Sequence, residues 1–144
     1  MLSTGSSHVD AQRAFSRLAR ARRRASIVSR LRRASACTRL RVYEARAAAA
    51  IGGGIREIPL AAINGTLEPS RAAQFDSHFR PAPVARARWE RVWLAEHRGT
   101  VLPPITVTPV EDGFAVRDGH HRVSVARARG ALTIDAAVET AYAA

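Results

Sequence analysis

The chain has no lysine, a single cysteine and no long apolar segment. One cysteine, Cys37, excludes both an intrachain disulfide and a zinc site built from several cysteines. No apolar run approaches the ~20 residues that a membrane-spanning helix requires, so no membrane partner is expected. All 23 basic residues are arginine. This bias indicates coding preference rather than mechanism, and it suits a bacterial cytoplasm.

Acidic residues are scarce in the first third of the chain. Residues 1–50 contain 12 arginines and only two acids, Asp10 and Glu44, which gives a net charge of +10. Residues 51–144 contain 11 arginines and 10 acids, a net charge of +1. We therefore predict two regions, an arginine-rich helical arm over 1–54 and a folded domain over 55–144.

The arm has helical periodicity. Apolar residues recur every three to four positions over 11–31 with arginines between them, which predicts a basic amphipathic helix broken near 35–38. A second helix is predicted over 40–50. Three consecutive glycines, Gly52, Gly53 and Gly54, predict a hinge between the arm and the domain.

The rest of the chain alternates between strand and helix patterns, which predicts an α+β fold with a small mixed sheet. A strand lies within 55–63, and 64–83 is predicted to be a long loop with at most a short helical turn. A helix over 84–97 presents Trp89 and Trp93 one turn apart, as expected for core residues. Strands at 105–110 and 114–117 flank an Asp-Gly turn, then a helix over 119–129 and a strand over 134–139 follow.

The segment Asp118-Gly119-His120-His121-Arg122, here called the Gly119 turn, passes from a strand to a helix. Glycine permits a sharp bend and close approach of a ligand, and the first amides of the next helix have no partners within it. Such a helix start binds anions, and an arginine adds a planar fork suited to phosphate oxygens. The alternative is a helix start that needs a glycine for structural reasons only.

The adjacent histidines do not indicate a metal site. Neighbouring side chains on a helix point about 100° apart and rarely ligate one ion together. We expect one imidazole to face the anion and the other to pack within the fold. Asp118 is expected to hold the turn, orient a histidine or contact a metal carried by a nucleotide.

The stretch 58–138 resembles the ParB/sulfiredoxin superfamily. The resemblance rests on the order of strands and helices, on Pro104-Ile105-Thr106-Val107, and on the Gly119 turn, which matches the family's Gly-x-x-Arg turn. In ParB proteins that turn grips the triphosphate of CTP, and in sulfiredoxin it binds ATP. The resemblance thus implies that Gly119, His121 and Arg122 bind phosphate.

The chain also departs from this family. His120 stands where sulfiredoxin keeps its reactive cysteine, so repair of sulfinic acids is not expected. The Glu-Asn-x-x-Arg box of ParB is absent, and no helix-turn-helix follows the last strand. We therefore expect a small, stand-alone member.

The family's long loop passes near the phosphate turn, which implies roles for polar residues of 70–81. Arg71 or Arg80 is then expected to close over the ligand, and Asp76 to act as an acid, a base or a metal contact. His78 is expected to be solvated. Asp76, Asp118 and His120 are the candidate catalytic groups.

The arginine arm has three interpretations. It binds nucleic acid in a salt-sensitive, sequence-blind manner, it packs on its own domain with arginines in solvent, or, less in keeping with the sequence, it is an organelle transit peptide. The candidate nucleic-acid residues are Arg22, Arg23, Arg24, Arg32 and Arg33.

The leading functional hypothesis is a ParB-like domain that binds a nucleotide or a nucleic-acid phosphate at the Gly119 turn. DNA association and nuclease or NTPase activity are the activities that the resemblance implies, with CTP, ATP or ADP as ligand and Mg²⁺ arriving with the nucleotide. No metal bound by protein side chains alone is expected. The alternatives are a nucleotide-dependent kinase of the free-serine-kinase type, with Asp76 or Asp118 as base, and a non-catalytic DNA-binding adaptor.

Overall fold

The computed structural model describes residues 6–32, 39–44 and 51–139. Within these residues, three α-helices and six strands make up the fold. The helices are α1 (Ser7–Leu31), α2 (Arg86–His97) and α3 (His120–Ala128). The strands are β1 (Arg41–Val42), β2 (Ile51–Pro59), β3 (Ile63–Thr66), β4 (Ile105–Val110), β5 (Gly113–Asp118) and β6 (Thr133–Glu139).

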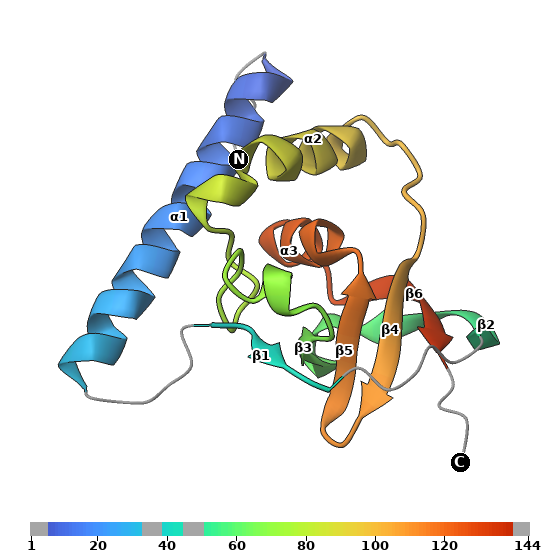
Figure 1. Cartoon of the computed structure of the whole chain (residues 1–144). Helices are drawn as coiled ribbons and strands as arrows, with labels where there is room; N and C mark the ends of the chain where they lie inside the picture. The colour runs from blue at the N-terminus through green and yellow to red at the C-terminus, as the bar shows by residue number, and fades with distance from the viewer. Residues whose placement is uncertain (1–5, 33–38, 45–50, 140–144) are drawn as a thin grey trace.

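The strands form one mixed sheet in the order β1-β3-β5-β4-β6-β2. β1 pairs with β3, β3 with β5, and β4 with β6 in parallel, whereas β4–β5 and β2–β6 are antiparallel. Helix α3 lies over one face of the sheet with α2 above it, and α1 packs on α2 at the outside (Figure 1). The α+β class predicted from the sequence is confirmed.

Alternation within the strands directs one set of apolar side chains toward α3. Ile105, Val107 and Val116 are fully buried, as is Val123 of α3, and they form one cluster between the sheet and the helix. Period-two alternation places residues 105 and 107 on the same face of β4. This layer fixes the start of α3 against the ends of β4 and β5.

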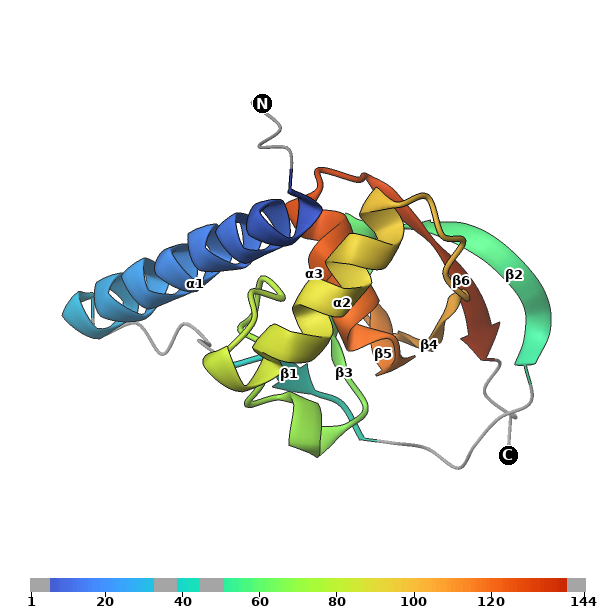
Figure 2. The same cartoon turned by 90° about the horizontal axis from the view of Figure 1, so that it is seen from above.

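A second apolar cluster joins α1 to α2. The Phe15 ring meets the Trp89 ring edge-on, with 5.6 Å between ring centroids. Trp89 is fully buried and its indole N–H donates to Ser124 Oγ at 2.8 Å, while Trp93 is 7% exposed. The prediction that both tryptophans belong to the core is confirmed. Beyond Phe15 no residue of α1 is fully buried, and the C-terminal half of the helix extends away from the body of the molecule (Figure 2).

Two predicted elements are wrong. Residues 63–66, assigned to a long loop, form strand β3, because parallel pairing with β5 supplies partners that local sequence cannot show. Arg41 and Val42 form β1 instead of a helix, and Leu40 beside them is buried in the core. The three glycines of the predicted hinge lie within β2, where a register shift accommodates them. The boundary at residue 54 stays a prediction.

Several sequence features lie outside the described residues, including Cys37, the break near 35–38 and residues 45–50 of the predicted second helix. None of the helices in the described ranges combines the length and apolar character needed to cross a membrane.

Candidate anion-binding site

The Gly119 turn joins β5 to α3 in a conformation that requires glycine. Gly119 is the residue before the first helical position and has φ of +108°, in the left-handed region. A Cβ there would lie 2.4 Å from Ile105 Cγ2, and Ile105 is fully buried in the core. The sharp bend therefore places the unpaired first amides of α3 at the C-terminal end of β5.

Arg122 is held beside this helix start. Its Nη1 donates to the carbonyl oxygens of Pro103 and Pro104, the latter at 2.9 Å, and its Nη2 donates to Asp118 Oδ2 at 3.0 Å. The side chain is only 16% exposed. A guanidinium has five N–H donors, so these three bonds leave donor capacity for a ligand. The bonds also fix its orientation in advance.

A cavity of about 240 Å³ opens at the start of α3, and we call it the α3 cavity. Its lining combines the whole Gly119 turn with Arg71, as predicted, and with Arg88, which the sequence analysis did not identify. The remaining lining residues are Val92, Leu102 and Pro103. Three arginines from three separate segments, Arg71, Arg88 and Arg122, therefore surround one cavity.

Both histidines of the turn are buried, with 3% of His120 and 6% of His121 exposed. Burial lowers the pKa of His120 to about 4, helped by the positive charge of Arg71. Burial likewise lowers the pKa of His121 to about 4, with Arg88 as the next cause. Both imidazoles are therefore neutral at pH 7, and the charge of the cavity comes from its arginines.

The two imidazoles have different partners. His120 Nε2 lies 2.6 Å from the hydroxyl of Thr66 on β3. Phe75 stacks on the His120 ring at 6.2 Å and meets the His121 ring edge-on at 5.1 Å between centroids. His120 is thus fastened within the fold by its hydroxyl contact, and both imidazoles contribute to the wall of the cavity.

Asp76 and Arg80, predicted to join the site, lie elsewhere and bind each other. The buried Asp76 carboxylate accepts hydrogen bonds from the backbone amides of His78 and Arg80, both at 2.9 Å, and from Arg80 Nε at 2.8 Å. Neither residue lines the α3 cavity. Asp76 shapes the 76–80 loop, and Arg80 serves as its charge partner. The exposed His78 is solvated as predicted.

The predicted nucleic-acid residues of α1 divide between two depressions. Arg22, Arg23 and Arg32 line a groove beside the 73–80 loop, and Arg24 lines a neighbouring depression on the same helix with Arg23. Arg33 lies outside the described residues. The helix predicted over 11–31 is confirmed in its position.

The described residues contain no group of three or more His, Cys, Asp or Glu side chains placed to hold a metal ion. Among them, Asp118 is the acidic residue that lines the α3 cavity, and 70% of its side chain is exposed.

No protein-family model and no curated protein matches this sequence. Among solved structures, the chain is similar to the crystal structure of sulfiredoxin from Arabidopsis thaliana, with 18% sequence identity and a TM-score of 0.44. The similarity covers 60% of this chain and 85% of that one. It carries no argument about the site, and membership of the ParB/sulfiredoxin superfamily stays a prediction.

Proposed function

We propose that the protein binds the phosphate groups of a nucleotide in the α3 cavity. The observation that carries the proposal is the convergence of Arg71, Arg88 and Arg122 on the start of α3. Gly119 lies beside them, at a position where a Cβ atom would clash with Ile105. Backbone amides at a helix start and guanidinium groups are the two donors that proteins combine for phosphate.

The balance of charge supports an anionic ligand. Three arginines and two neutral histidines face one carboxylate, Asp118, which Arg122 already contacts. Positive groups held close together repel one another, and an anion between them relieves that repulsion. The positive potential also explains part of the low pKa of both histidines, whose causes include Arg71 and Arg88.

The size of the cavity supports partial enclosure of the ligand. Pockets that enclose a drug-sized molecule measure about 300–1,000 Å³, and this one measures about 240 Å³. Two or three phosphate groups fit such a volume, with the base and ribose outside. Mg²⁺ bound to those phosphates would have Asp118 as its protein ligand and would neutralise part of their charge.

We further propose that the chain is a small ParB/sulfiredoxin-like protein. This proposal is supported by the order of a strand, a glycine and a helix that begins His-His-Arg. Hydrolysis of the nucleotide is the activity to test, with Asp118 as the carboxylate at the cavity.

Isothermal titration calorimetry with CTP, ATP and ADP, each with and without Mg²⁺, tests binding. Arg88→Gln removes a guanidinium that lines the cavity, and Arg98→Gln is the matched control at the C-terminal end of α2, because Arg98 is exposed and does not line the cavity. A charged hydrogen bond contributes about 1.5–3 kcal/mol, so Arg88→Gln should weaken binding about tenfold or more. Arg98→Gln should change it less than about threefold.

Equal affinities for wild type and Arg88→Gln would show that the ligand binds elsewhere. Absence of heat with all three nucleotides, in protein that melts cooperatively, would remove the proposal. Phosphate release measured on the same samples decides whether binding leads to hydrolysis.

A further inference from the structure

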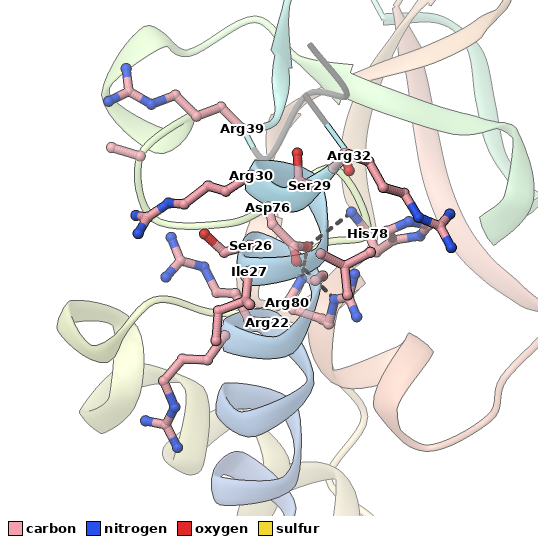
Figure 3. A pocket seen from close by; sticks show the side chains of 15 residues that line it. Arg22, Ser26, Ile27, Ser29, Arg30, Arg32, Arg39, Asp76, His78 and Arg80 are labelled. Carbon is pink, nitrogen blue, oxygen red and sulfur yellow. Dashed lines mark hydrogen bonds and ion pairs between the residues drawn. The ribbon is translucent and has the colours of Figure 1, made fainter. Parts of the chain in front are cut away.

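A second and larger depression lies between α1 and the 73–80 loop. This α1 groove has a volume of about 660 Å³, and Figure 3 shows it from close by. The C-terminal half of α1 and Arg32 after it form one wall, Ala73, Asp76, Ser77, His78 and Arg80 form the other, and Arg39 also lines the groove. The groove is therefore a concave surface built from segments far apart in the sequence.

Arginine dominates this surface. Six of the described arginines line the groove, and Asp76 is the acidic residue among its described lining. The Asp76 carboxylate is already paired with Arg80, as the dashed lines in Figure 3 show. Five guanidinium groups remain to face solvent or a ligand: Arg22, Arg23, Arg30, Arg32 and Arg39.

Arg22 adds an independent observation. Its Nε is buried and has no hydrogen-bond partner. Buried polar atoms are nearly always paired in folded proteins, and an unpaired charged donor is especially unfavourable. Because Arg22 lines the groove, this unpaired donor belongs to its wall.

We propose that the α1 groove binds the phosphodiester backbone of a nucleic acid. Guanidinium groups that line a concave surface bind the phosphate oxygens of the backbone and do not distinguish base sequences. The proposal does not require nucleotide binding at the α3 cavity, because Arg71, Arg88 and Arg122 are absent from the lining of the groove.

The length of the basic surface favours a polymer over a single nucleotide. A neighbouring depression lined by Arg17, Arg20, Arg23, Arg24 and Ile27 continues along the same helix, and Arg23 belongs to both. From Arg17 to Arg32 the helix rises about 22 Å at 1.5 Å per residue. One strand of a DNA duplex places about six phosphates along that distance.

The distribution of apolar side chains disfavours an anionic membrane. Ile27 and Leu31 are exposed, but Arg20 and Arg24 occupy the same face of α1 at helical spacing. A helix that lies in a membrane separates an apolar face from its charges, and this one mixes them. Charge repulsion between two such helices likewise disfavours a second copy of the chain as partner.

Fluorescence anisotropy of the full chain with a labelled random-sequence 20-base-pair duplex, and with one of its strands alone, tests the proposal across a salt series. The groove variant is the triple substitution Arg22→Gln, Arg30→Gln, Arg32→Gln. The control triple, Arg56→Gln, Arg91→Gln, Arg98→Gln, lowers the net charge by the same amount at exposed positions outside both sites.

The groove variant should bind roughly 100-fold more weakly near 0.1 M salt, with the slope of log K against log salt reduced by about 2–3. The control triple should lose less than about threefold. Circular dichroism and thermal melting of both variants verify that they are folded.

Equal losses in the two triples would attribute binding to net charge and overturn the groove assignment. Absence of binding to both nucleic acids at 50 mM salt would also overturn it. Tighter binding of wild type to phosphatidylglycerol vesicles than to the duplex, at equal phosphate concentration, would replace nucleic acid by a membrane surface. Arg88→Gln should bind the duplex as wild type does, whether or not the α3 cavity binds nucleotides.

Discussion

The α3 cavity and the α1 groove are both rich in arginine, but they are organised differently. In the cavity, Arg122 is held by two backbone carbonyls and a carboxylate, and buried imidazoles form one wall. In the groove, most arginines are exposed on a helix whose outer half has no fully buried residue. The first arrangement is fixed by contacts within the chain, whereas the exposed arginines of the second would become ordered only on binding a ligand.

The two arrangements differ in the free energy that ordering their side chains costs on binding. Immobilising a long side chain on binding costs about 0.5–1.5 kcal/mol, and Arg122 is already immobilised by its neighbours. Exposed charges are also screened by salt, whereas partly buried ones are screened much less. We therefore expect small, selective ligands at the cavity and salt-sensitive, unselective binding at the groove.

Substitution of Gly119 should lower stability strongly, and of the two sites it should change the cavity, which Gly119 lines. In Gly119→Ala, the left-handed conformation costs about 1–2 kcal/mol, and the clash of the new Cβ with Ile105 adds about 1–3 kcal/mol. The free energy of unfolding, measured by chemical denaturation, should fall by roughly 4 kcal/mol in total.

Gly99→Ala is the matched control for Gly119→Ala. Gly99 also has positive φ, +77°, but an added Cβ would meet nothing within 4 Å. It should lose only the conformational part, about 1–2 kcal/mol, and keep nucleotide binding. Equal destabilisation by the two substitutions would show that Ile105 does not constrain the turn.

Detaching α1 should separate the two regions. Phe15→Ala removes the ring that packs on Trp89, and truncation of a buried Phe costs about 3–5 kcal/mol. Because Arg80 Nη1 and the Ala21 carbonyl oxygen, 3.4 Å apart, lie across the groove, loosening α1 disrupts one of its walls. Duplex affinity should fall while nucleotide affinity stays within about threefold, since α1 does not line the cavity.

Loss of both activities in Phe15→Ala, with the melting transition intact, would show that the cavity depends on α1 after all. Val84→Ala, at an exposed position, serves as the control for loss of apolar side-chain volume.

Acid should destabilise the fold through the cavity histidines. The pKa of His120 and of His121 is lowered to about 4 in the folded chain, and an unfolded histidine has a pKa of about 6.5. The unfolded state therefore binds more protons below pH 6.5, so stability is fully present above that pH and declines as the pH falls toward 4. At pH 5 the loss should be about 2 kcal/mol per histidine.

Denaturation curves at pH 7.5, 6 and 5 measure this loss. A saturating nucleotide should reduce it, because an anion beside the imidazoles raises the pKa of both side chains toward the usual range. A stability profile that is flat between pH 7.5 and 5 would show that the imidazoles are hydrated in solution. The positive charges of Arg71 and Arg88 disfavour protonation of both imidazoles, whereas the negative charge of Asp118 favours protonation of His120.

The elements with clear local signals could be predicted from the sequence. The Asp112-Gly113 turn between β4 and β5, the glycine before α3 and the tryptophan spacing of α2 all depend on neighbouring residues. Strands β1 and β3 could not be predicted, because they are two and four residues long and acquire their partners from distant strands.

Only the part of the candidate site that consecutive residues form, the Gly119 turn, could be predicted from local sequence. The Gly119 turn can be read from consecutive residues, and Arg71 was placed by resemblance to a family. No local sequence pattern distinguishes Arg88 from the other arginines of α2. Only the packing of α2 against α3 brings it to the cavity. Asp76 looked like a reactive carboxylate, but the backbone amides of its own loop and Arg80 occupy it.

The carbonyl acceptors of Arg122 belong to the main chain of residues 103 and 104, so side-chain replacement there leaves both oxygens in place. The path of the 98–104 connection, rather than its chemistry, determines where this guanidinium points. The exposed side chains of Thr100 and Val101 could therefore be exchanged without moving the acceptors, whereas shortening the connection by one position would retract the acceptors and release the arginine.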